Sequence, residues 1–340
     1  MQPFRYVRAE RPETAINVAA VTADSHARSP VQFLAGGTTL LDLMKLDVVR
    51  PETLVEITPL QQTSMGRIEV TSQGLRIGAL VRMSDAAEHD IIKRDYPVLA
   101  QSLSLAASQQ LRNMATLGGN VLQRTRCGYF RDAAVANCNK RTPGSGCAAL
   151  QGVNRSHAVL GTSDQCIASY PGDFAQALMV LDASVTTLSR SGTRNVKFAD
   201  LHNVPGTTPH IETRLKPGEL ITAFMIPSGF HTKRSVYIKM RDRASFAFAL
   251  ASAAVALDLD GDRVRDVRIG LGGVATKPWR AIETERLLVG QTLDEVRAFR
   301  AAEAAFADAR TSPQNAFKVT LGQQVIVKAL MECKRMEVPA

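Results

Sequence analysis

Hydrophobic and polar residues change their period several times within the first sixty positions. Residues 13–23 place apolar side chains at helical spacing, whereas 31–35 form a short apolar run that is typical of a buried strand. That run leads straight into Gly36-Gly37, and a second helical pattern covers 40–46 before another strand-like run at 54–57. The pattern indicates a compact βα unit in which a glycine turn joins a strand to a helix.

The middle of the chain alternates hairpin and helix patterns. Short apolar runs on either side of a polar, glycine-containing turn predict hairpins, and Ser84 caps one of the expected helices. The expected elements, in chain order, are a hairpin at 68–70 and 75–79, helices at 84–92, 97–111 and 173–181, a hairpin at 183–189 and 194–198, and a strand at 220–227 that ends in proline.

A last unit begins near Gly229. Its expected elements are strands at 236–239 and 264–270, an alanine-rich apolar segment at 246–258 with a turn at 260–262, and helices at 292–310 and 315–334. This order favours cofactor binding in the first 225 residues and a mixed unit of sheet and helix at the end.

The composition is that of an ordinary globular protein and disfavours several classes. A chain of 340 residues, 45% hydrophobic and 21% charged, is long enough for two or three domains. It has no apolar run near the ~20 residues that span a bilayer, and residues 1–6 show no signal-peptide core. The net charge is +9, but Lys and Arg are scattered and aromatics make up only 5%. We therefore expect no nucleic-acid partner, and basic residues that serve anionic cofactors and an acidic partner surface.

Two pairs of adjacent glycines offer a candidate phosphate site. We call residues 33–40 the first glycine turn and residues 116–120 the second glycine turn. Glycine lets backbone N–H groups approach a pyrophosphate closely, and a following helix N-terminus favours negative charge. The spacing matches neither the Rossmann nor the Walker fingerprint, and a plain turn explains either pair alone. Together they favour a dinucleotide held from two sides.

Four of the five cysteines lie in one stretch that has little apolar content. Cys127, Cys138, Cys147 and Cys166 are spaced C-x10-C-x8-C-x18-C, and Cys333 stands apart as an incidental thiol. The spacing lacks the close pairs of a zinc site, and the six histidines are isolated. Spacing alone leaves three alternatives open, namely an iron–sulfur cluster, two disulfides, or unrelated thiols. Nearby basic residues would either balance an anionic cluster or form a solvated loop surface; they are Arg124, Arg126, Arg131, Lys140, Arg141 and Arg155.

Several motifs resemble the FAD-binding subunit of the molybdenum hydroxylases, a family that includes xanthine dehydrogenase and carbon monoxide dehydrogenase. Residues 35–45 are similar to its first flavin loop and 116–120 to its second. The segment 170–173 resembles the one whose aspartate contacts the flavin's ribityl or ribose region. Residues 237–239 and 272–275 resemble signatures of its C-terminal domain. The resemblance covers essentially the whole chain, with the motifs in order.

One branch resembles this chain more closely, the FAD subunits of bacterial periplasmic aldehyde oxidoreductases. The similar segments are 123–127, 138–141, 143–150 and 241–245. The insertion of that branch carries a [4Fe–4S] cluster, and the four cysteines fall at matching positions. The resemblance thus favours the cluster among the alternatives that spacing leaves open.

The resemblance implies an α+β fold like that of the carbon monoxide dehydrogenase flavoprotein. A PCMH-type FAD-binding domain of two α+β subdomains is followed by a C-terminal α+β domain. We expect FAD-binding subdomain 1 at 1–59, subdomain 2 at 60–228 with the iron–sulfur insertion at 124–168, and the C-terminal domain at 229–340.

Site residues carry over by matching position. The residues expected to wrap the FAD pyrophosphate are Phe33, Leu34, Ala35, Gly36, Gly37, Thr38, Thr39 and Leu40, with Thr116, Gly119 and Asn120 closing the second side. Asp173 is expected to accept hydrogen bonds from hydroxyls, Ile221 to pack near the isoalloxazine, and Lys239 to lie near its pyrimidine edge, where a cation favours the anionic reduced flavin. Cys127, Cys138, Cys147 and Cys166 would ligate the [4Fe–4S] cluster.

Two departures from the family pattern limit the resemblance. Relatives of xanthine dehydrogenase carry an aromatic residue ten positions before the second flavin loop, and this chain has Ala106 there. Ring stacking at that position is therefore not expected. The chain also has no distinct nicotinamide-binding motif, so NAD is not expected as the acceptor.

The implied function is electron transfer rather than acid–base catalysis, and we expect no catalytic residue in this chain. Electrons would come from [2Fe–2S] centres of a small subunit, which receives them from a molybdenum-cofactor large subunit, and would leave FAD for an external acceptor. Rival readings are the flavin subunit of another molybdenum hydroxylase (xanthine dehydrogenase-like or hydroxybenzoyl-CoA reductase-like), a stand-alone FAD oxidoreductase, and a disulfide-bonded scaffold without enzymatic activity. Co-export with a signal-bearing partner predicts a periplasmic location, with a cytoplasmic one as the alternative.

Overall fold

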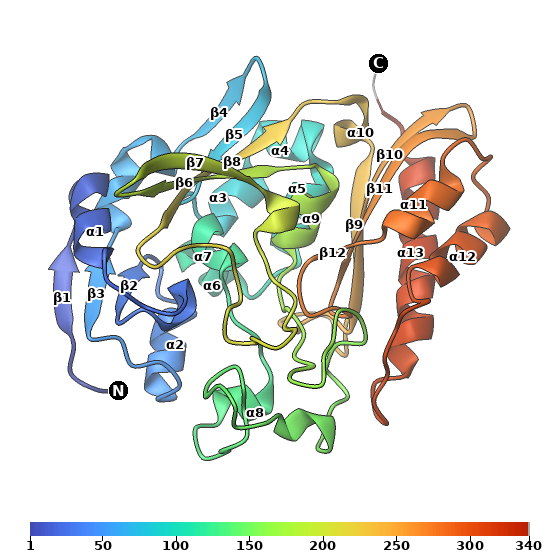
Figure 1. The fold of residues 1–340 in the computed structure, drawn as a ribbon. Helices are drawn as coiled ribbons and strands as arrows, with labels where there is room; N and C mark the ends of the chain where they lie inside the picture. The colour runs from blue at the N-terminus through green and yellow to red at the C-terminus, as the bar shows by residue number, and fades with distance from the viewer. Residues whose placement is uncertain (339–340) are drawn as a thin grey trace.

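The computed structural model describes residues 1–338 as three β-sheets with helices around and between them (Figure 1). The first sheet is parallel, in the order β1-β3-β2. Because parallel neighbours need crossover connections, a helix follows each of the first two strands. The bounds are β1 (Arg5–Arg8), α1 (Pro12–Ala19), β2 (Val31–Leu34), α2 (Leu40–Lys45) and β3 (Thr53–Glu56). The predicted βα unit is confirmed, although α1 ends four residues before the expected position 23.

The second sheet is antiparallel, in the order β4-β5-β8-β6-β7. Its strands are β4 (Ile68–Thr71), β5 (Gly74–Gly78), β6 (Ser184–Ser189), β7 (Gly192–Lys197) and β8 (Leu220–Pro227). Both predicted hairpins are present. Every residue of helix α9 (Phe174–Val180) is buried, and the Phe174 ring meets that of Phe224 edge-on, with 5.7 Å between ring centroids. This contact fixes α9 against the sheet.

Two expected helices are each divided into two. The helix predicted at 84–92 is α3 (Met83–Glu88) followed by α4 (Asp90–Asp95), and the one predicted at 97–111 is α5 (Pro97–Ser104) followed by α6 (Gln109–Met114). The second break has a local cause. Ser108 accepts a hydrogen bond from the Leu111 N–H at 3.3 Å and so begins a new helix, while Ala107 takes a φ of 48° that no helix allows.

The third sheet is antiparallel, in the order β12-β11-β10-β9, and three helices cover one of its faces. The bounds are α10 (Phe230–Lys233), β9 (Ser235–Met240), β10 (Ala251–Asp260), β11 (Arg263–Gly272), β12 (Trp279–Arg280), α11 (Ile282–Leu288), α12 (Glu295–Ala304) and α13 (Phe317–Arg335). Helix α13 differs from its predicted range by one or two residues at each end, as frayed ends commonly do. Helix α12 spans only 10 residues of the range predicted at 292–310, so that prediction was too long at both ends.

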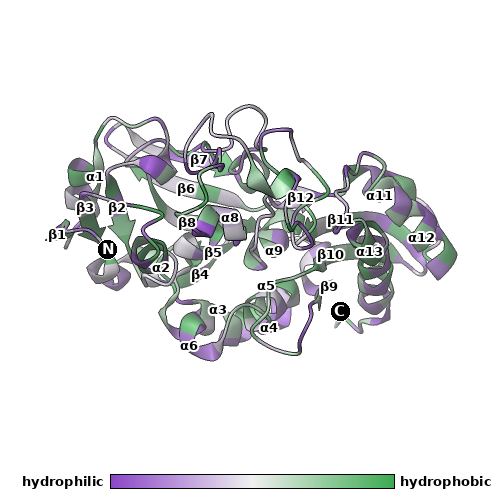
Figure 2. Ribbon diagram, turned by 90° about the horizontal axis from the view of Figure 1, so that it is seen from below, coloured by the Kyte–Doolittle hydropathy of each residue, from purple (hydrophilic) through white to green (hydrophobic). Residues whose placement is uncertain are grey.

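Strand β10 joins two hydrophobic cores. Alternate residues point to opposite faces of a strand. Ala254 and Ala256 lie in the core that contains α5 and α9, whereas Ala253, Val255 and Leu257 lie in the core beneath α13. In Figure 2, α13 carries both hydrophobic and hydrophilic residues, as expected for a helix with one buried face. Residues 251–258 of the alanine-rich run thus belong to a strand covered on both faces, which explains their continuous apolar character, whereas residues 246–250 precede the strand.

The cysteine segment, residues 124–168, lies below the three sheets in the view of Figure 1. Its regular structure consists of α8 (Gly128–Arg131) and a single 3-10 turn (Ala148–Leu150). It follows the short helix α7 (Leu117–Val121), which is built from the second glycine turn. The insertion therefore depends on side-chain contacts, rather than on sheet or helix packing, to hold its shape.

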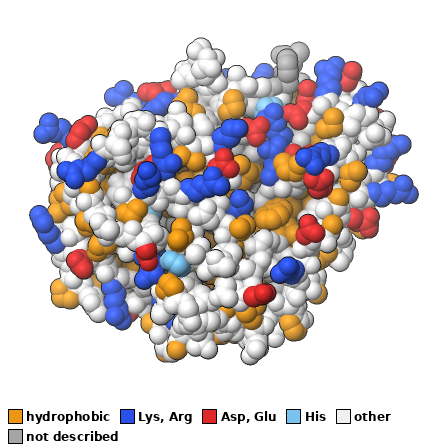
Figure 3. Space-filling view, viewed as in Figure 1, with side chains coloured by type: hydrophobic (Ala, Val, Ile, Leu, Met, Phe, Trp, Pro, Cys, Tyr) orange, Lys and Arg blue, Asp and Glu red, His pale blue; other side chains and the backbone are white. Residues whose placement is uncertain are grey.

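The three sheets fall in the three segments proposed from the sequence, but the division into domains stays a prediction. Lys and Arg are interspersed with Asp and Glu over the face seen in Figure 3. None of the helices in residues 1–338 combines the length and hydrophobicity that crossing a bilayer requires.

Candidate functional site

The first glycine turn follows β2 and leads into α2. Gly37 has a φ of 72°, which favours glycine. Gly36 lies close to the end of helix α6. A Cβ built on Gly36 would be only 1.9 Å from the carbonyl oxygen of Met114. Met114 ends the helix that precedes the second glycine turn. The absence of a side chain at Gly36 therefore brings the two turns together.

The second glycine turn is held in a similar way. The Gly118 N–H donates to the Ala79 carbonyl at 2.8 Å, and a Cβ on Gly118 would lie 3.1 Å from Ala79. Thr116 accepts a hydrogen bond from the Gly119 N–H at 3.4 Å and caps α7. The sequence predicted a turn here, and the structure shows that this turn is the first turn of a helix.

Two cavities meet at the glycine turns. The smaller cavity, of about 170 Å³, is lined by both turns together with Leu220 and Ile221. The larger cavity, of about 530 Å³, shares Thr38, Thr39 and Gly119 with it and extends towards Asp173. Two hollows joined at paired glycine turns have the shape that a dinucleotide needs, with its diphosphate at the junction. The buried Oδ1 of Asn120, which lines the larger cavity, has no hydrogen-bond partner among the described residues, so a ligand hydroxyl or amide fits there.

Most of the predicted flavin-binding residues line these cavities. The smaller one is lined by Phe33, Ala35, Gly36, Gly37, Thr38, Thr39, Leu40, Thr116, Gly119 and Ile221. Asn120 and Asp173 line the larger one. Leu34 and Lys239, both well inside the described part of the chain, line neither cavity. Of the two residues predicted near the flavin ring, Ile221 lines the smaller cavity and Lys239 lies outside the lining of both. Their roles towards FAD remain predictions.

Lys239 lies behind Asp173 in a buried network. The ammonium donates to Asp173 Oδ2 at 2.8 Å and to the Leu105 carbonyl at 3.0 Å, and its side chain is 1% exposed. The Tyr237 hydroxyl donates to the other carboxylate oxygen at 2.5 Å. Burial raises the pKa of Asp173, whereas Lys239 and Tyr237 favour its carboxylate form. Lys239 is thus placed to act on the larger cavity through Asp173 rather than by direct contact.

Two phenylalanines on the outer wall of the larger cavity were not predicted as site residues. Phe246 and Phe248 line it and are 55% and 50% exposed. Phe246 has a φ of 49°, and the guanidinium groups of Arg243 and Arg126 lie over the two rings, at 5.5 and 5.1 Å from the centroids. The sequence placed this segment in an alanine-rich apolar run, so the only local signal was the pair of aromatics within it.

The four clustered cysteines come together, as predicted. They arise from separate loops and line one small space of about 10 Å³, the cysteine cavity. All are free thiols, and backbone bridges link Cys138 to Cys147 and Ser163 to Cys166. Burial raises the pKa of Cys127 to about 11, and a hydrogen bond with Cys166 lowers the pKa of Cys147 to about 6. His157 Nε2 lies 3.2 Å from the Cys127 sulfur.

The cysteine cavity fits an iron–sulfur cluster in part. Four thiols, of which Cys138 and Cys166 are buried, are the donor set of a [4Fe–4S] cluster in kind and number. The cavity volume is that of about one water molecule, so the thiols must separate to admit a cluster. Among residues 1–338, no group of three or more His, Cys, Asp or Glu side chains is placed to hold a metal ion. Free thiols also differ from the disulfides of the scaffold alternative.

Several basic residues of the cysteine segment are paired with carboxylates rather than solvated. Arg131 binds Asp42 of α2 at 2.8 Å, and Arg126 lies 3.5 Å from the same carboxylate. Arg124 and Lys140 both contact Glu212, at 2.6 and 3.4 Å. Burial opposes ionisation of Glu212, but these two cations lower its pKa to about 2. Glu212 lies on a loop that the sequence interpretation left without a role, and no local pattern marked it.

Comparison with known protein families matches nearly the whole chain. Residues 2–229 match the FAD binding domain in molybdopterin dehydrogenase, and residues 235–333 match the CO dehydrogenase flavoprotein C-terminal domain. The chain is 47% identical to the aldehyde oxidoreductase FAD-binding subunit of Escherichia coli (strain K12), over 98% of this chain and 99% of that one. It is 30% identical to the glyceraldehyde dehydrogenase medium chain of Sulfolobus acidocaldarius, over 86% and 83% of the two chains.

Solved structures show the same fold. A chain of the Cu,Mo-CO dehydrogenase aligns with a TM-score of 0.74 and 24% identity, over 98% of this chain and 99% of that one. A chain of quinoline 2-oxidoreductase from Pseudomonas putida 86 aligns with a TM-score of 0.73 and 23% identity, over 98% of both. The predicted α+β fold, a flavoprotein-type binding region followed by a C-terminal α+β domain, is confirmed.

Proposed function

This chain belongs to the FAD-binding subunits of the molybdenum hydroxylases, and from that membership we propose that it is the electron-transfer subunit of an aldehyde oxidoreductase. The observation that carries the proposal is the convergence of two glycine turns, more than seventy residues apart in sequence, on one pair of joined cavities. The substrate class rests on the full-length likeness to the aldehyde oxidoreductase subunit of Escherichia coli.

FAD supplies the ability to take up electrons one at a time and release them as a pair. The chain's own residues bind and orient it. The first glycine turn offers its backbone at the junction of the cavities, where the diphosphate would lie, and the second turn, whose Gly118 and Gly119 N–H groups bond within the chain, closes the other side. Asp173, held by Lys239 and Tyr237, presents a fixed carboxylate to the larger cavity.

We propose a complex of three different subunits, in which this chain receives electrons from [2Fe–2S] centres of a small subunit. A large subunit with a molybdenum cofactor would oxidise the aldehyde, and an external acceptor would take electrons from FAD. The relatives support this arrangement, because the two compared by sequence are named as an FAD-binding subunit of an aldehyde oxidoreductase and as a medium chain of glyceraldehyde dehydrogenase. No residue of this chain is assigned a catalytic role in the proposal.

We further propose that Cys127, Cys138, Cys147 and Cys166 ligate a [4Fe–4S] cluster that pins the insertion. Their convergence and free state support this, as does the lack of regular structure in the segment they connect. The change Cys138→Ser is expected to lower iron content and subunit assembly. Cys333→Ser is the matched control, because Cys333 is buried in the C-terminal core far along the chain. Normal iron and assembly in Cys138→Ser would refute the structural role.

The test of the main proposal is to purify the assembled complex and assay flavin, iron, sulfide and aldehyde-dependent reduction of an artificial dye. We expect FAD bound to this chain, and dye reduction that requires all three subunits. Aldehyde turnover by the isolated chain would instead indicate a stand-alone oxidoreductase, and a colourless chain would refute the flavin site. The resemblance to a periplasmic branch leads us to propose a periplasmic location. Activity in the fraction released during spheroplast preparation, rather than in the lysate of the spheroplasts, would test it.

A further inference from the structure

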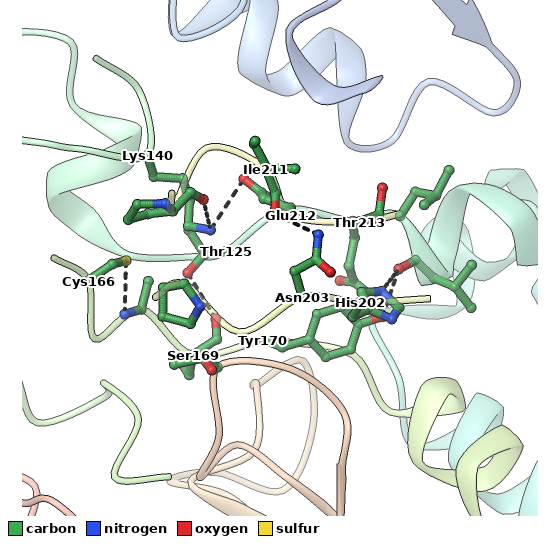
Figure 4. A pocket seen from close by; sticks show the side chains of 17 residues that line it. Thr125, Lys140, Cys166, Ser169, Tyr170, His202, Asn203, Ile211, Glu212 and Thr213 are labelled. Atoms are coloured by element: carbon green, nitrogen blue, oxygen red, sulfur yellow. Dashed lines mark hydrogen bonds and ion pairs between the residues drawn. The ribbon is translucent and has the colours of Figure 1, made fainter. Parts of the chain in front are cut away.

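A small polar cavity separates the cysteine cavity from the smaller cavity at the glycine turns. This connecting cavity has a volume of about 40 Å³ and is shown in Figure 4. It shares Lys140 and Cys166 with the cysteine cavity, and Glu212 and Thr213 with the smaller cavity. The two candidate cofactor sites are therefore separated by one layer of side chains.

Glu212 occupies the centre of that layer and faces a cation on each side. On the cysteine side, Lys140 Nζ lies 3.4 Å from its carboxylate and donates to the Pro209 carbonyl at 3.0 Å (Figure 4). Lys140 and Cys166 both line the cysteine cavity. The Glu212 carboxylate thus holds Lys140, the cation that lines the cysteine cavity.

On the other side, Arg124 makes two hydrogen bonds to the same carboxylate oxygen, at 2.6 and 2.9 Å. Arg124 lines the smaller cavity, and its guanidinium also lies 4.5 Å from the centroid of the Phe130 ring. The side chains of Arg124, Lys140 and Glu212 are only 10%, 13% and 16% exposed. At these exposures their charges are weakly screened by water, so each acts on both neighbouring cavities.

We propose that Glu212 is a positioning residue shared by both cofactor sites, whose negative charge sets the electrostatic potential at the flavin and at the iron–sulfur centre together. The inference rests on the proposed function. The triad carries a net charge of +1 with all three groups ionised. Removing the carboxylate charge leaves two cations between the sites, and this favours electron uptake at both. Removing Lys140 instead leaves no net charge and favours electron loss at both.

The experiment uses the assembled complex and compares Glu212→Gln, Lys140→Met, the double variant and wild type. Redox titration followed by flavin absorbance and by the electron paramagnetic resonance of the cluster gives both midpoint potentials. We expect Glu212→Gln to raise both midpoint potentials. At a fixed potential, the ratio of reduced to oxidised form should increase tenfold, which corresponds to about 30 mV for a two-electron couple and about 59 mV for a one-electron couple. Lys140→Met should lower both, and the double variant should return both towards wild type.

Glu285→Gln is the matched control, since Glu285 is another poorly exposed carboxylate, paired with Arg280 in the C-terminal domain. It should leave both potentials unchanged. If Glu212→Gln fails to assemble, Lys140→Met still tests the sign of the effect. If Glu212→Gln keeps normal flavin and iron but shifts neither midpoint potential, or only one of them, the inference about Glu212 is overturned and the proposed function is not. Wild-type complex without iron and sulfide would overturn the cluster proposal, and the shared role with it.

Discussion

Replacing Lys239 tests whether this residue acts through Asp173. In Lys239→Met the buried carboxylate keeps its hydrogen bond from Tyr237 but loses its only ion pair among the described residues, and the Leu105 carbonyl loses a donor from the ammonium. Removing one partner of a buried ion pair costs about 3–5 kcal/mol, because the remaining charge stays desolvated. We expect a loss of this size in the free energy of unfolding, measured by urea denaturation.

The loss should depend on pH in a defined direction. Burial already raises the pKa of Asp173 above its ordinary value of 3.8, and removing the ammonium raises it further. A carboxyl group whose pKa is higher in the folded than in the unfolded state stabilises the fold less as pH rises. The deficit of Lys239→Met should therefore be largest near neutral pH and shrink as pH falls towards 3.8, where Asp173 is protonated in the folded variant.

A second change and a control complete this test. Adding Asp173→Asn to Lys239→Met removes the uncompensated charge, so the double variant should recover most of the lost stability. Lys328→Met is the control, since Lys328 is 52% exposed and lies 3.7 Å from Glu332; its expected cost is about 0.5 kcal/mol or less. A Lys239→Met variant within about 1 kcal/mol of wild type, or a double variant no more stable than the single one, would refute the assigned network.

Three further predictions use other contacts. Gly36→Ala should destabilise the chain by about 1–3 kcal/mol or more and abolish flavin retention, because its Cβ would lie 1.9 Å from the Met114 carbonyl oxygen. Urea denaturation measures the first effect and flavin absorbance the second. Gly128→Ala is the control and should change neither, because a Cβ at Gly128 has no atom within 4 Å. Ion pairs lower the pKa of Glu212 from 4.5 to about 2, so its carboxylate contributes about 3 kcal/mol to the free energy of unfolding above pH 4.5. That contribution is lost as pH falls towards 2, and the unfolding free energy of Glu212→Gln, measured over the same pH range, should not show this loss. Burial lowers the pKa of Lys318 to about 7 from 10.5, so wild type should gain stability between those pH values and Lys318→Met should not, as unfolding curves at pH 7, 9 and 10.5 will show.

Local sequence signals predicted the elements around the site well. Apolar alternation located β2, β5 and β8, and the adjacent glycines marked both turns, because strand period and glycine backbone freedom are properties of a few neighbouring residues. The breaks within two helices were missed. The sequence shows continuous apolar spacing through residue 107, and only the folded backbone reveals that Ser108 starts a new helix there.

The site was predicted less completely than the fold. The resemblance supplied the residues of the two turns, which line the cavities, but it placed Ile221 and Lys239 at one end of the flavin. Ile221 lies in the wall of the smaller cavity, whereas Lys239 is buried behind Asp173. Sequence position could not show this difference, because Ile221 lies on β8 and Lys239 on β9, which belong to different sheets.

By itself, the sequence located the glycine turns and most of the strands and longer helices, since each depends on residue types at short spacing, and it showed that four thiols share one segment. Tertiary structure decided which charges meet. Glu212 contacts Arg124 and Lys140 across 88 and 72 positions of chain, and no periodic pattern spans such distances. Burial then fixes the outcome, because a desolvated charge must find an opposite one, and only the packed chain determines which opposite charge lies within reach.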